Sequence, residues 1–503
     1  MSRLLYLLLP ALLSAGVHPV FERADAPEPT PLDRLLVAHW QKLGIQPANP
    51  CSDAVFLRRA YLDVTGTLPS AADAEAFLKD TSPTKRAALI DRLLASDGYA
   101  AYYAMKWSDM LRVKAEFPVN LWPNAAQAYY HWIRASLAAN KPYDQFAREL
   151  LTSTGSNFRD PAVNFYRALQ SREPQAVAQA VALAFMGTRT APAAMAGFWS
   201  QIGYKETKEW KEEIVFFNPA KKLEPVPAFP DGTPVKIAPN QDPREVFAAW
   251  LTASQNPYFS RAIVNRVWCW LLGRGIIHEP DDIRPDNPPE NPELLAYLEK
   301  QLVASRYDLK AIFREILNSN AYQLSSIPAS SEAVLHFAAY PLRRLDAEVL
   351  ADAINGIAGT TESYTSAIPE PYTFMPDDQR AVELPDGSIT GAFLDLFGKP
   401  ARDTGLESDR NNRMTDAQRL HLLNSTSIQR KLQNGPHLVE MMRDYREPRE
   451  LINQLYLTIL SRYPSEDEWK LVQAHSQSGV RGAAAVFDLA WALVNSTEFL
   501  CRH

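Results

Sequence analysis

The chain has 503 residues, a formal net charge of -6 and 46% hydrophobic residues, without any run of basic residues. This length predicts two or three domains that fold without disulfide staples, and the acidic balance argues against nucleic acid as a partner. The three cysteines are far apart and odd in number, which excludes a disulfide framework.

Residues 1–16 have the pattern of a short signal peptide. Arg3 precedes an apolar run from Leu4 to Leu13, and small residues follow it up to Gly16. The run is too short to span a membrane, and no later segment is apolar enough to do so. We therefore expect a periplasmic or secreted protein with no membrane span after signal removal. The alternative is an uncleaved peptide that stays as an anchor.

Helical patterns dominate the rest of the chain. Capping boxes open two helices, at Thr415 with Gln418 and at Ser465 with Glu468. Alternating strand patterns are scarce. The clearest apolar repeats at helical spacing cover residues 86–95, 293–303, 309–317 and 486–494. We therefore predict a mainly α protein with little β structure.

Seven prolines interrupt residues 218–243 and predict a Pro-rich linker there. The linker would join an N-terminal helical domain at 30–217 to a C-terminal helical domain at 244–503. Two irregular loops are expected in the second domain, at 360–391 and 397–413. Loops of this length are usually functional or disordered.

One predicted helix carries an unusual set of polar residues. It begins at Asn256, and Arg261, Asn265 and Trp268 share one face at spacings of four and three, while Arg266 projects elsewhere. One interpretation is a ligand-binding face, where guanidinium groups hold a carboxylate or sulfate and the indole stacks on a sugar ring. The other is a buried polar network that locks the helix against its neighbours.

Three carboxylates are the candidate partners of this helix. In the network interpretation, Arg261 or Arg266 pairs with Asp281, Asp282 or Glu348, and the usual pairing of buried charges favours this interpretation. The same carboxylates are the candidate catalytic residues of a hydrolase, with Asp281 or Asp282 acting together with Glu348. Against that role, adjacent carboxylates on one loop tend to point apart.

We expect no metal and no cofactor. The loop 281–287 is rich in oxygen ligands of the kind that calcium prefers, but its spacing is not that of an EF-hand and Arg284 lies in its middle. The nine histidines are scattered without metal-ligand spacing.

Further arginines are candidate ligand-binding residues. Arg344 and Glu348 are four residues apart, which predicts an ion pair within one helix. Arg410 belongs to the highly charged loop 397–413, which is either solvated surface or a wall folded over the Arg261 face. Arg274 lies in a Gly-Arg-Gly turn after the polar helix.

Spaced motifs relate the chain to two known families. Residues 56–66 and 93–96 resemble domain-of-unknown-function family 1549, a planctomycete cytochrome-type domain. The remaining motifs resemble its usual companion, family 1553, and lie at residues 256–259, 264–268, 273–275, 281–282, 291–295, 343–345 and 418–424.

The resemblance implies an exported protein of a group often encoded beside sulfatase-like proteins and linked to polysaccharide use. Many relatives carry a Cys-x-x-Cys-His haem motif after a segment like 185–187, but residues 188–196 contain no cysteine and no histidine. Covalent c-type haem needs those groups, so it is excluded here.

We therefore expect a non-haem binding or assembly protein for an acidic or sulfated glycan, or for an envelope protein partner. The first alternative is a carboxylate-dependent hydrolase that acts on glycans. The second is a redox partner of a separate cytochrome.

Overall fold

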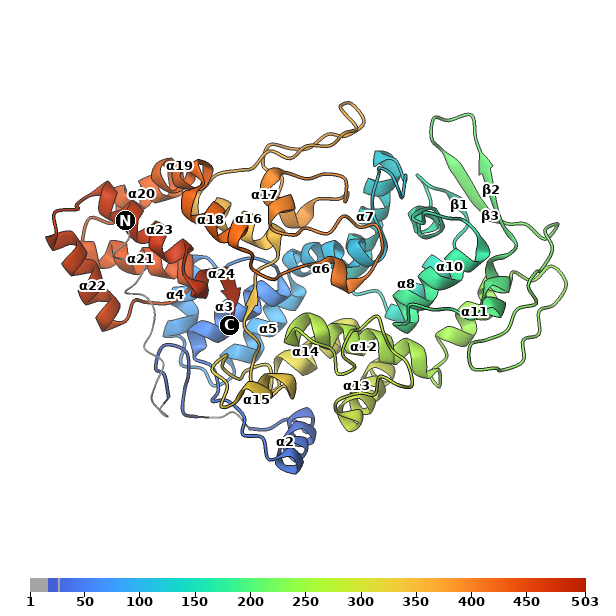
Figure 1. Cartoon of the computed structure of the whole chain (residues 1–503), viewed down its shortest axis with the longest axis horizontal. Coiled ribbons are helices and arrows are strands. Elements are labelled where there is room, and N and C mark those ends of the chain that lie inside the picture. The colour runs from blue at the N-terminus through green and yellow to red at the C-terminus, as the bar shows by residue number, and fades with distance from the viewer. Residues whose placement is uncertain (1–16, 26–27) are drawn as a thin grey trace.

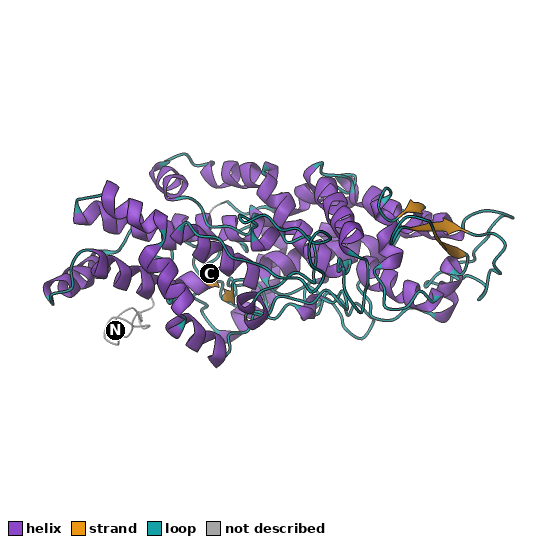
Figure 2. Cartoon of the chain, turned by 90° about the horizontal axis from the view of Figure 1, so that it is seen from above, coloured by secondary structure: helices purple, strands orange, loops and turns teal. Residues whose placement is uncertain are grey.

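Helices build almost all of the protein. The computed structural model describes residues 17–25 and 28–503, and the expected signal peptide at 1–16 lies outside them. Figure 2 shows an elongated molecule of packed helices with strands gathered mainly at one end. The predicted mainly α class with little β structure is confirmed.

The helices follow one another with short connections; η marks a 3₁₀ helix, except for the π-helical turn η2. Those of the first part are α2 (Pro31–Leu43), α3 (Asp53–Val64), α4 (Ala71–Lys79), α5 (Lys85–Ala95), α6 (Asp97–Met110), α7 (Pro123–Ala138), α8 (Tyr143–Thr152), η1 (Pro161–Val163), α9 (Asn164–Arg167), α10 (Pro174–Val181), η2 (Ala182–Met186) and η3 (Ala193–Trp199). Those of the second part are α11 (Pro243–Leu251), α12 (Pro257–Leu272), α13 (Pro292–Ala304), α14 (Leu309–Leu317), α15 (Ser331–Leu335), α16 (Ala347–Ala358), η4 (Ala381–Glu383), α17 (Ala392–Leu396), η5 (Glu407–Asp409), α18 (Asp416–Asn424), α19 (Thr426–Asn434), α20 (Pro436–Asp444), α21 (Pro448–Leu460), α22 (Glu466–Gln477), α23 (Ala483–Val494) and α24 (Thr497–Leu500).

Capping side chains fix where several helices begin. Both predicted capping boxes are present, at Thr415 before α18 and at Ser465 before α22. Asn256 accepts the backbone N–H groups of Tyr258 and Phe259 at 3.0 and 3.3 Å, and therefore starts α12. These side chains pair with N–H groups that a helix cannot satisfy in its first turn.

The strands form two small antiparallel sheets. β1 (Gly155–Ser156), β2 (Ile202–Glu206) and β3 (Glu213–Phe217) pair in the order β1-β3-β2 at the right of Figure 1. β4 (Arg343–Arg344) pairs with β5 (Cys501–Arg502), so that Arg343 lies opposite Arg502 and Arg344 opposite Cys501. This second pairing brings three arginines together from positions far apart in the sequence.

Helix α3 ties the beginning of the chain to its end. Arg58 is buried and donates to the carbonyl groups of Ile459 and Phe499, both at 2.9 Å. Arg59 is also buried and donates to the carbonyl of His503 at 2.9 Å. Figure 1 accordingly shows α3 beside α24 near the centre of the molecule.

One hydrophobic core contains residues from both halves of the chain. Residues 218–242 are irregular and connect β3 to α11. Whether the two halves are separate domains, joined at 218–243, stays a prediction.

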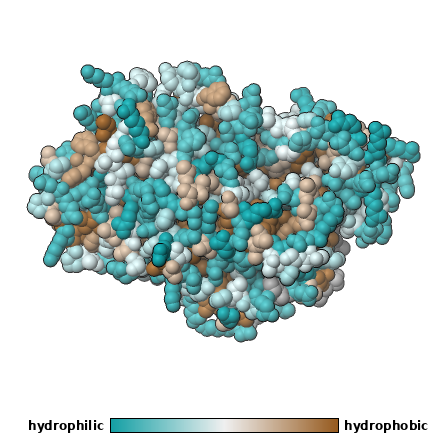
Figure 3. Space-filling model, turned by 180° about the vertical axis from the view of Figure 1, so that it is seen from behind, coloured by the Kyte–Doolittle hydropathy of each residue, from teal (hydrophilic) through white to brown (hydrophobic). Residues whose placement is uncertain are grey.

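The surface is mainly polar. Figure 3 shows hydrophilic side chains over most of one face, with apolar side chains in small scattered patches. Among the described residues, we find no helix with both the length and the apolar character needed to cross a membrane.

Candidate functional site

A cleft rich in arginine lies where α6, the end of α12, the β4–β5 pair and the loop before α18 meet. Its volume is about 880 Å³, within the range of about 300–1,000 Å³ that is typical of ligand sites. Its charged lining residues are eight cationic side chains and three carboxylates: Lys106, Arg274, Arg343, Arg344, Arg410, Arg413, Arg419 and Arg502, with Glu279, Asp346 and Glu407. The cleft is therefore cationic, although the whole chain is acidic.

Asp346 organises the floor of the cleft. It is fully buried and accepts hydrogen bonds from the Tyr102 hydroxyl at 2.8 Å, the Asn412 amide at 2.7 Å and Arg502 at 3.0 Å. Lys106 lies 3.2 Å from the same carboxylate. Burial alone would raise the pKa of Asp346, but Lys106 and Arg502 hold it well below its usual range. Asp346 is therefore a fixed anion that holds several cations in place.

Arg410 brings the loop 397–413 against the same floor. Its guanidinium lies 2.7 Å from Asp109 on α6 and 2.7 Å from Glu348 on α16. All three side chains are nearly buried, so this cluster fixes the loop against two helices. Glu348 is thus engaged by Arg410.

The predicted helical ion pair between Arg344 and Glu348 is wrong. α16 begins only at Ala347, and Arg344 belongs to strand β4. The reason is the pairing of Arg344 with Cys501, a long-range contact that local spacing does not reveal. The chain turns between the two residues, and Arg344 no longer shares a helix face with Glu348.

Arg344 is a buried cation without a carboxylate partner. It donates to the carbonyl groups of Phe397, Asn411 and Leu345 at 2.7, 2.9 and 3.0 Å, and no ion pair reaches it within the described part of the chain. Burial lowers its pKa. The hydrogen-bond partners of this charge are therefore all neutral, and the carboxylates of Asp346 and Glu348 act on it only from beyond ion-pair distance.

Two more cleft arginines also lack a carboxylate partner. Arg274 donates to the carbonyl of Leu335 at 2.8 Å, and Arg413 is exposed beside Met414. Neither forms an ion pair with any residue in the described ranges. Together with Arg344 they give the cleft three cationic side chains that form no ion pair within the described residues.

Two of the three residues on the expected ligand-binding face of α12 lie in the core. Asn265 is fully buried, where its amide donates to the Ile277 carbonyl at 3.1 Å and accepts the Ile277 N–H at 2.8 Å. Trp268 is fully buried with its ring centroid 5.2 Å from that of Phe337. A sugar ring cannot stack on an indole that is enclosed by protein. The ligand-binding interpretation is corrected for Asn265 and Trp268, because α13, α14 and η2 pack around this helix.

Arg266 forms the buried pair that the network interpretation predicts. It lies 2.7 Å from Asp281, and both side chains are almost completely buried. Asp281 also accepts the backbone N–H of Glu407 at 2.6 Å, so it connects α12 to the cleft loop. Arg261 differs, because it pairs with Glu299 at 2.8 Å near the surface.

The candidate carboxylates do not converge. Asp282 is half-buried and lies 3.1 Å from Arg284, which also approaches Asp286 at 3.4 Å. The cleft is not lined by Asp281, Asp282 or Glu348. Each of these carboxylates has an arginine partner instead.

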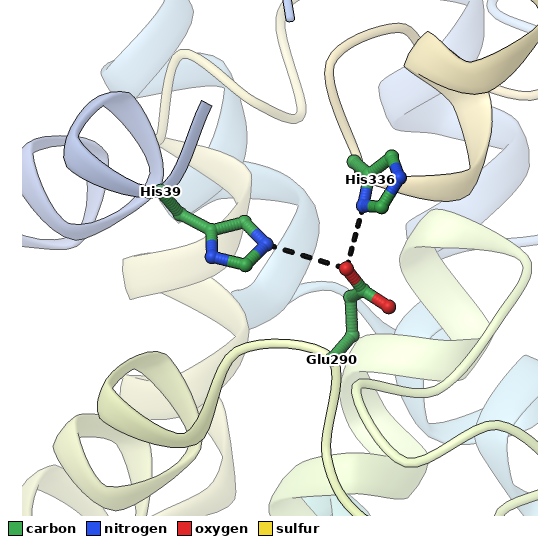
Figure 4. A group of neighbouring side chains, drawn as sticks. All are labelled: His39, Glu290 and His336. Carbon is green, nitrogen blue, oxygen red and sulfur yellow. Dashed lines mark hydrogen bonds and ion pairs between the residues drawn. The ribbon is translucent and has the colours of Figure 1, made fainter. Parts of the chain in front are cut away.

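The sequence patterns do not predict a second cluster of polar side chains. His39, Glu290 and His336 point toward one another from three separate segments (Figure 4). The sequence also gave no sign that Lys106, Asp346 and Arg502 meet in the cleft. Only their charge and the apolar character of their neighbours could have drawn attention to them.

Comparison with known proteins assigns both halves of the chain. No curated protein and no solved structure matches it. The PSCyt2 family model, described as a protein of unknown function (DUF1549), matches residues 31–197, and the PSD1 model, described as a protein of unknown function (DUF1553), matches residues 243–476. The cleft takes Lys106 from the first segment and most of its arginines from the second. The chain thus contains a PSCyt2 domain followed by a PSD1 domain.

Proposed function

We propose that this protein is an exported, non-haem binding protein whose arginine-rich cleft takes an acidic or sulfated glycan. The observation that carries the proposal is the presence of Arg274, Arg344 and Arg413 in one cleft without any carboxylate partner among the described residues. The link to carbohydrate comes from the family resemblance, and the preference for negative charge comes from the cleft.

Physical chemistry favours an anion in this position. A buried charge is costly unless it is paired, so an anionic group near Arg344 would offset a cost that the folded protein already carries. Arginine presents several N–H groups in a planar fork that matches sulfate and carboxylate oxygens. Each charge-assisted hydrogen bond contributes about 1.5–3 kcal/mol. Two or three such contacts supply useful affinity for a short charged oligosaccharide.

No specific observation favours either alternative function. The hydrolase requires a free pair of carboxylates, whereas Asp281 and Glu348 hold Arg266 and Arg410 in ion pairs.

For the redox alternative, the cleft thiols are Cys269 and Cys501. Burial raises the pKa of Cys269 to about 12 and that of Cys501 to about 11. A thiol that stays protonated is a weak nucleophile and a poor redox centre.

A titration with matched ligands tests the proposal. We expect the protein to bind a sulfated oligosaccharide at least about tenfold more tightly than the same oligosaccharide without sulfate, a difference of about 1.4 kcal/mol. The affinity should fall with added salt, because exposed charges are screened. Equal affinity for the sulfated and unsulfated forms would contradict the proposal. Binding of an acidic peptide but of neither sugar would point to a protein partner.

A further inference from the structure

We propose that His39, Glu290 and His336 form a binding site for a divalent first-row transition metal, independent of the cleft. His39 lies on α2, Glu290 in the loop before α13, and His336 directly after α15. Figure 4 shows the Glu290 carboxylate between the two imidazole rings. Within the described ranges, this is the only group of three or more His, Cys, Asp or Glu ligand atoms found so close together.

One of the two contacts of Glu290 has the spacing of a tetrahedral metal site. Glu290 Oε1 lies 3.3 Å from His39 Nε2 and 2.5 Å from His336 Nδ1, and the three donor atoms lie within 4.8 Å of one another. Zinc bonds to nitrogen and oxygen are about 2.0–2.2 Å long, which places the ligand atoms of a tetrahedral site about 3.4 Å apart. The contact of Glu290 with His39 already has this length. The distance from Glu290 Oε1 to His336 Nδ1 has to increase by about 1 Å when an ion binds.

The donor set selects the class of metal. Two imidazole nitrogens with one carboxylate oxygen occur at zinc sites and at iron(II) sites that keep positions open for water or substrate. Calcium and magnesium prefer oxygen ligands, so imidazoles select against both. The side chains of His39, Glu290 and His336 are 18%, 25% and 23% exposed. An ion can therefore enter from solvent, and water can complete its coordination.

Hydrogen bonds to the backbone hold two of the donors in position. The Trp40 indole donates to the His336 carbonyl at 2.7 Å, and the Glu290 N–H donates to the Ile276 carbonyl at 2.7 Å. Arg274 donates to the carbonyl of Leu335, the residue before His336, at 2.8 Å. A site on fixed backbone needs little rearrangement to bind an ion.

A bound ion would join three segments that are distant in the sequence, and its binding energy would add to the stability of the folded chain.

The chain offers a matched control. His475 lies 3.1 Å from Asp488, with side chains 20% and 28% exposed. This pair has similar burial and the same kinds of group as two of the three proposed ligands, His39 and Glu290, but it lacks a second imidazole. His475→Ala should therefore leave metal binding unchanged.

Calorimetric titration of the chelator-treated full chain with Zn²⁺ tests the proposal. We expect about one ion per chain for the wild type and for His475→Ala, and no heat with Mg²⁺ or Ca²⁺. His39→Ala and Glu290→Gln should each weaken binding by more than the roughly 10- to 100-fold that loss of an outer-shell partner causes. Absence of zinc uptake by the wild type, or unchanged affinity in both variants, would overturn the proposal.

Thermal unfolding gives a second readout if His39→Ala does not fold. Zn²⁺ should raise the melting temperature of the wild type and of His475→Ala, because it binds only the folded chain. The melting temperature of Glu290→Gln, which keeps a hydrogen-bonding side chain, should not respond. A zinc response in Glu290→Gln as large as that of the wild type would refute the site.

Discussion

Replacement of Asp281 with alanine is expected to lower the free energy of unfolding by about 3–5 kcal/mol, the usual cost of removing one partner from a buried ion pair. Arg266 and Asp281 are 1% and 0% exposed and lie 2.7 Å apart. Without Asp281, the nearest oxygen partners of Arg266 are the Leu183 carbonyl at 3.5 Å and Glu407 at 3.6 Å. The Glu407 N–H would lose its acceptor as well.

A double variant separates a broken pair from a damaged core. Arg266→Met with Asp281→Leu removes both charges but still leaves the Glu407 N–H without its acceptor, so its stability should lie between those of the wild type and Asp281→Ala. Urea denaturation followed by circular dichroism measures each variant. A loss of less than about 1 kcal/mol for Asp281→Ala, or a double variant no more stable than Asp281→Ala, would show that the buried pair does not stabilise the fold.

The remaining predictions concern the core, the surface and pH. Trp268→Ala should cost about 3–5 kcal/mol in chemical denaturation, since it empties a fully buried site. Arg261→Ala should cost less than about 1 kcal/mol, because the pair with Glu299 is partly exposed; a larger loss would show that this pair is structural. Burial raises the pKa of Asp352 to about 6. As pH rises, the unfolded chain therefore releases this proton at a lower pH than the folded chain does. The free energy of unfolding should then fall by up to about 3 kcal/mol between about pH 4 and pH 6. Asp352→Asn should therefore gain stability relative to the wild type at pH 7 but not at pH 4, and a pH-independent difference in urea denaturation would contradict this.

Local signals in the sequence predicted much of the secondary structure. The capping residues Asn256, Thr415 and Ser465 pair with N–H groups only a few positions away, so their role is visible in the sequence. The helical repeat at 309–317 likewise depends only on local spacing and appears as α14 with these bounds.

The candidate site depends on contacts that local patterns do not encode. The polar residues of α12 are expected to need partners. Asn265 finds them in the backbone of Ile277, whereas the indole N–H of Trp268 is buried in the core without a hydrogen-bond partner among the described residues. The spacing of Arg344 from Glu348 predicts a helix, because spacing does not show the long-range pairing of Arg344 with Cys501. His39 and Glu290 meet across 251 positions. In each case the contacts of the residue are set by tertiary packing. A single sequence does not reveal this packing.

The cleft arginines allow the most direct test of the proposed function. Arg274→Gln and Arg413→Gln each remove a charge that has no carboxylate partner among the described residues, so neither breaks an ion pair. Arg430→Gln is the matched control, because Arg430 is also exposed and without an ion pair in the described chain but does not line the cleft.

The decisive measurement is the dissociation constant for a sulfated oligosaccharide in these three variants and the double variant. We expect a weakening of about tenfold or more for Arg274→Gln with Arg413→Gln combined, and wild-type affinity for Arg430→Gln. The melting temperature should be unchanged for Arg413→Gln and Arg430→Gln, and slightly lower for Arg274→Gln, which loses its hydrogen bond to the Leu335 carbonyl. If the double variant binds as tightly as the wild type, or if Arg430→Gln weakens binding equally, the cleft is not the anion site.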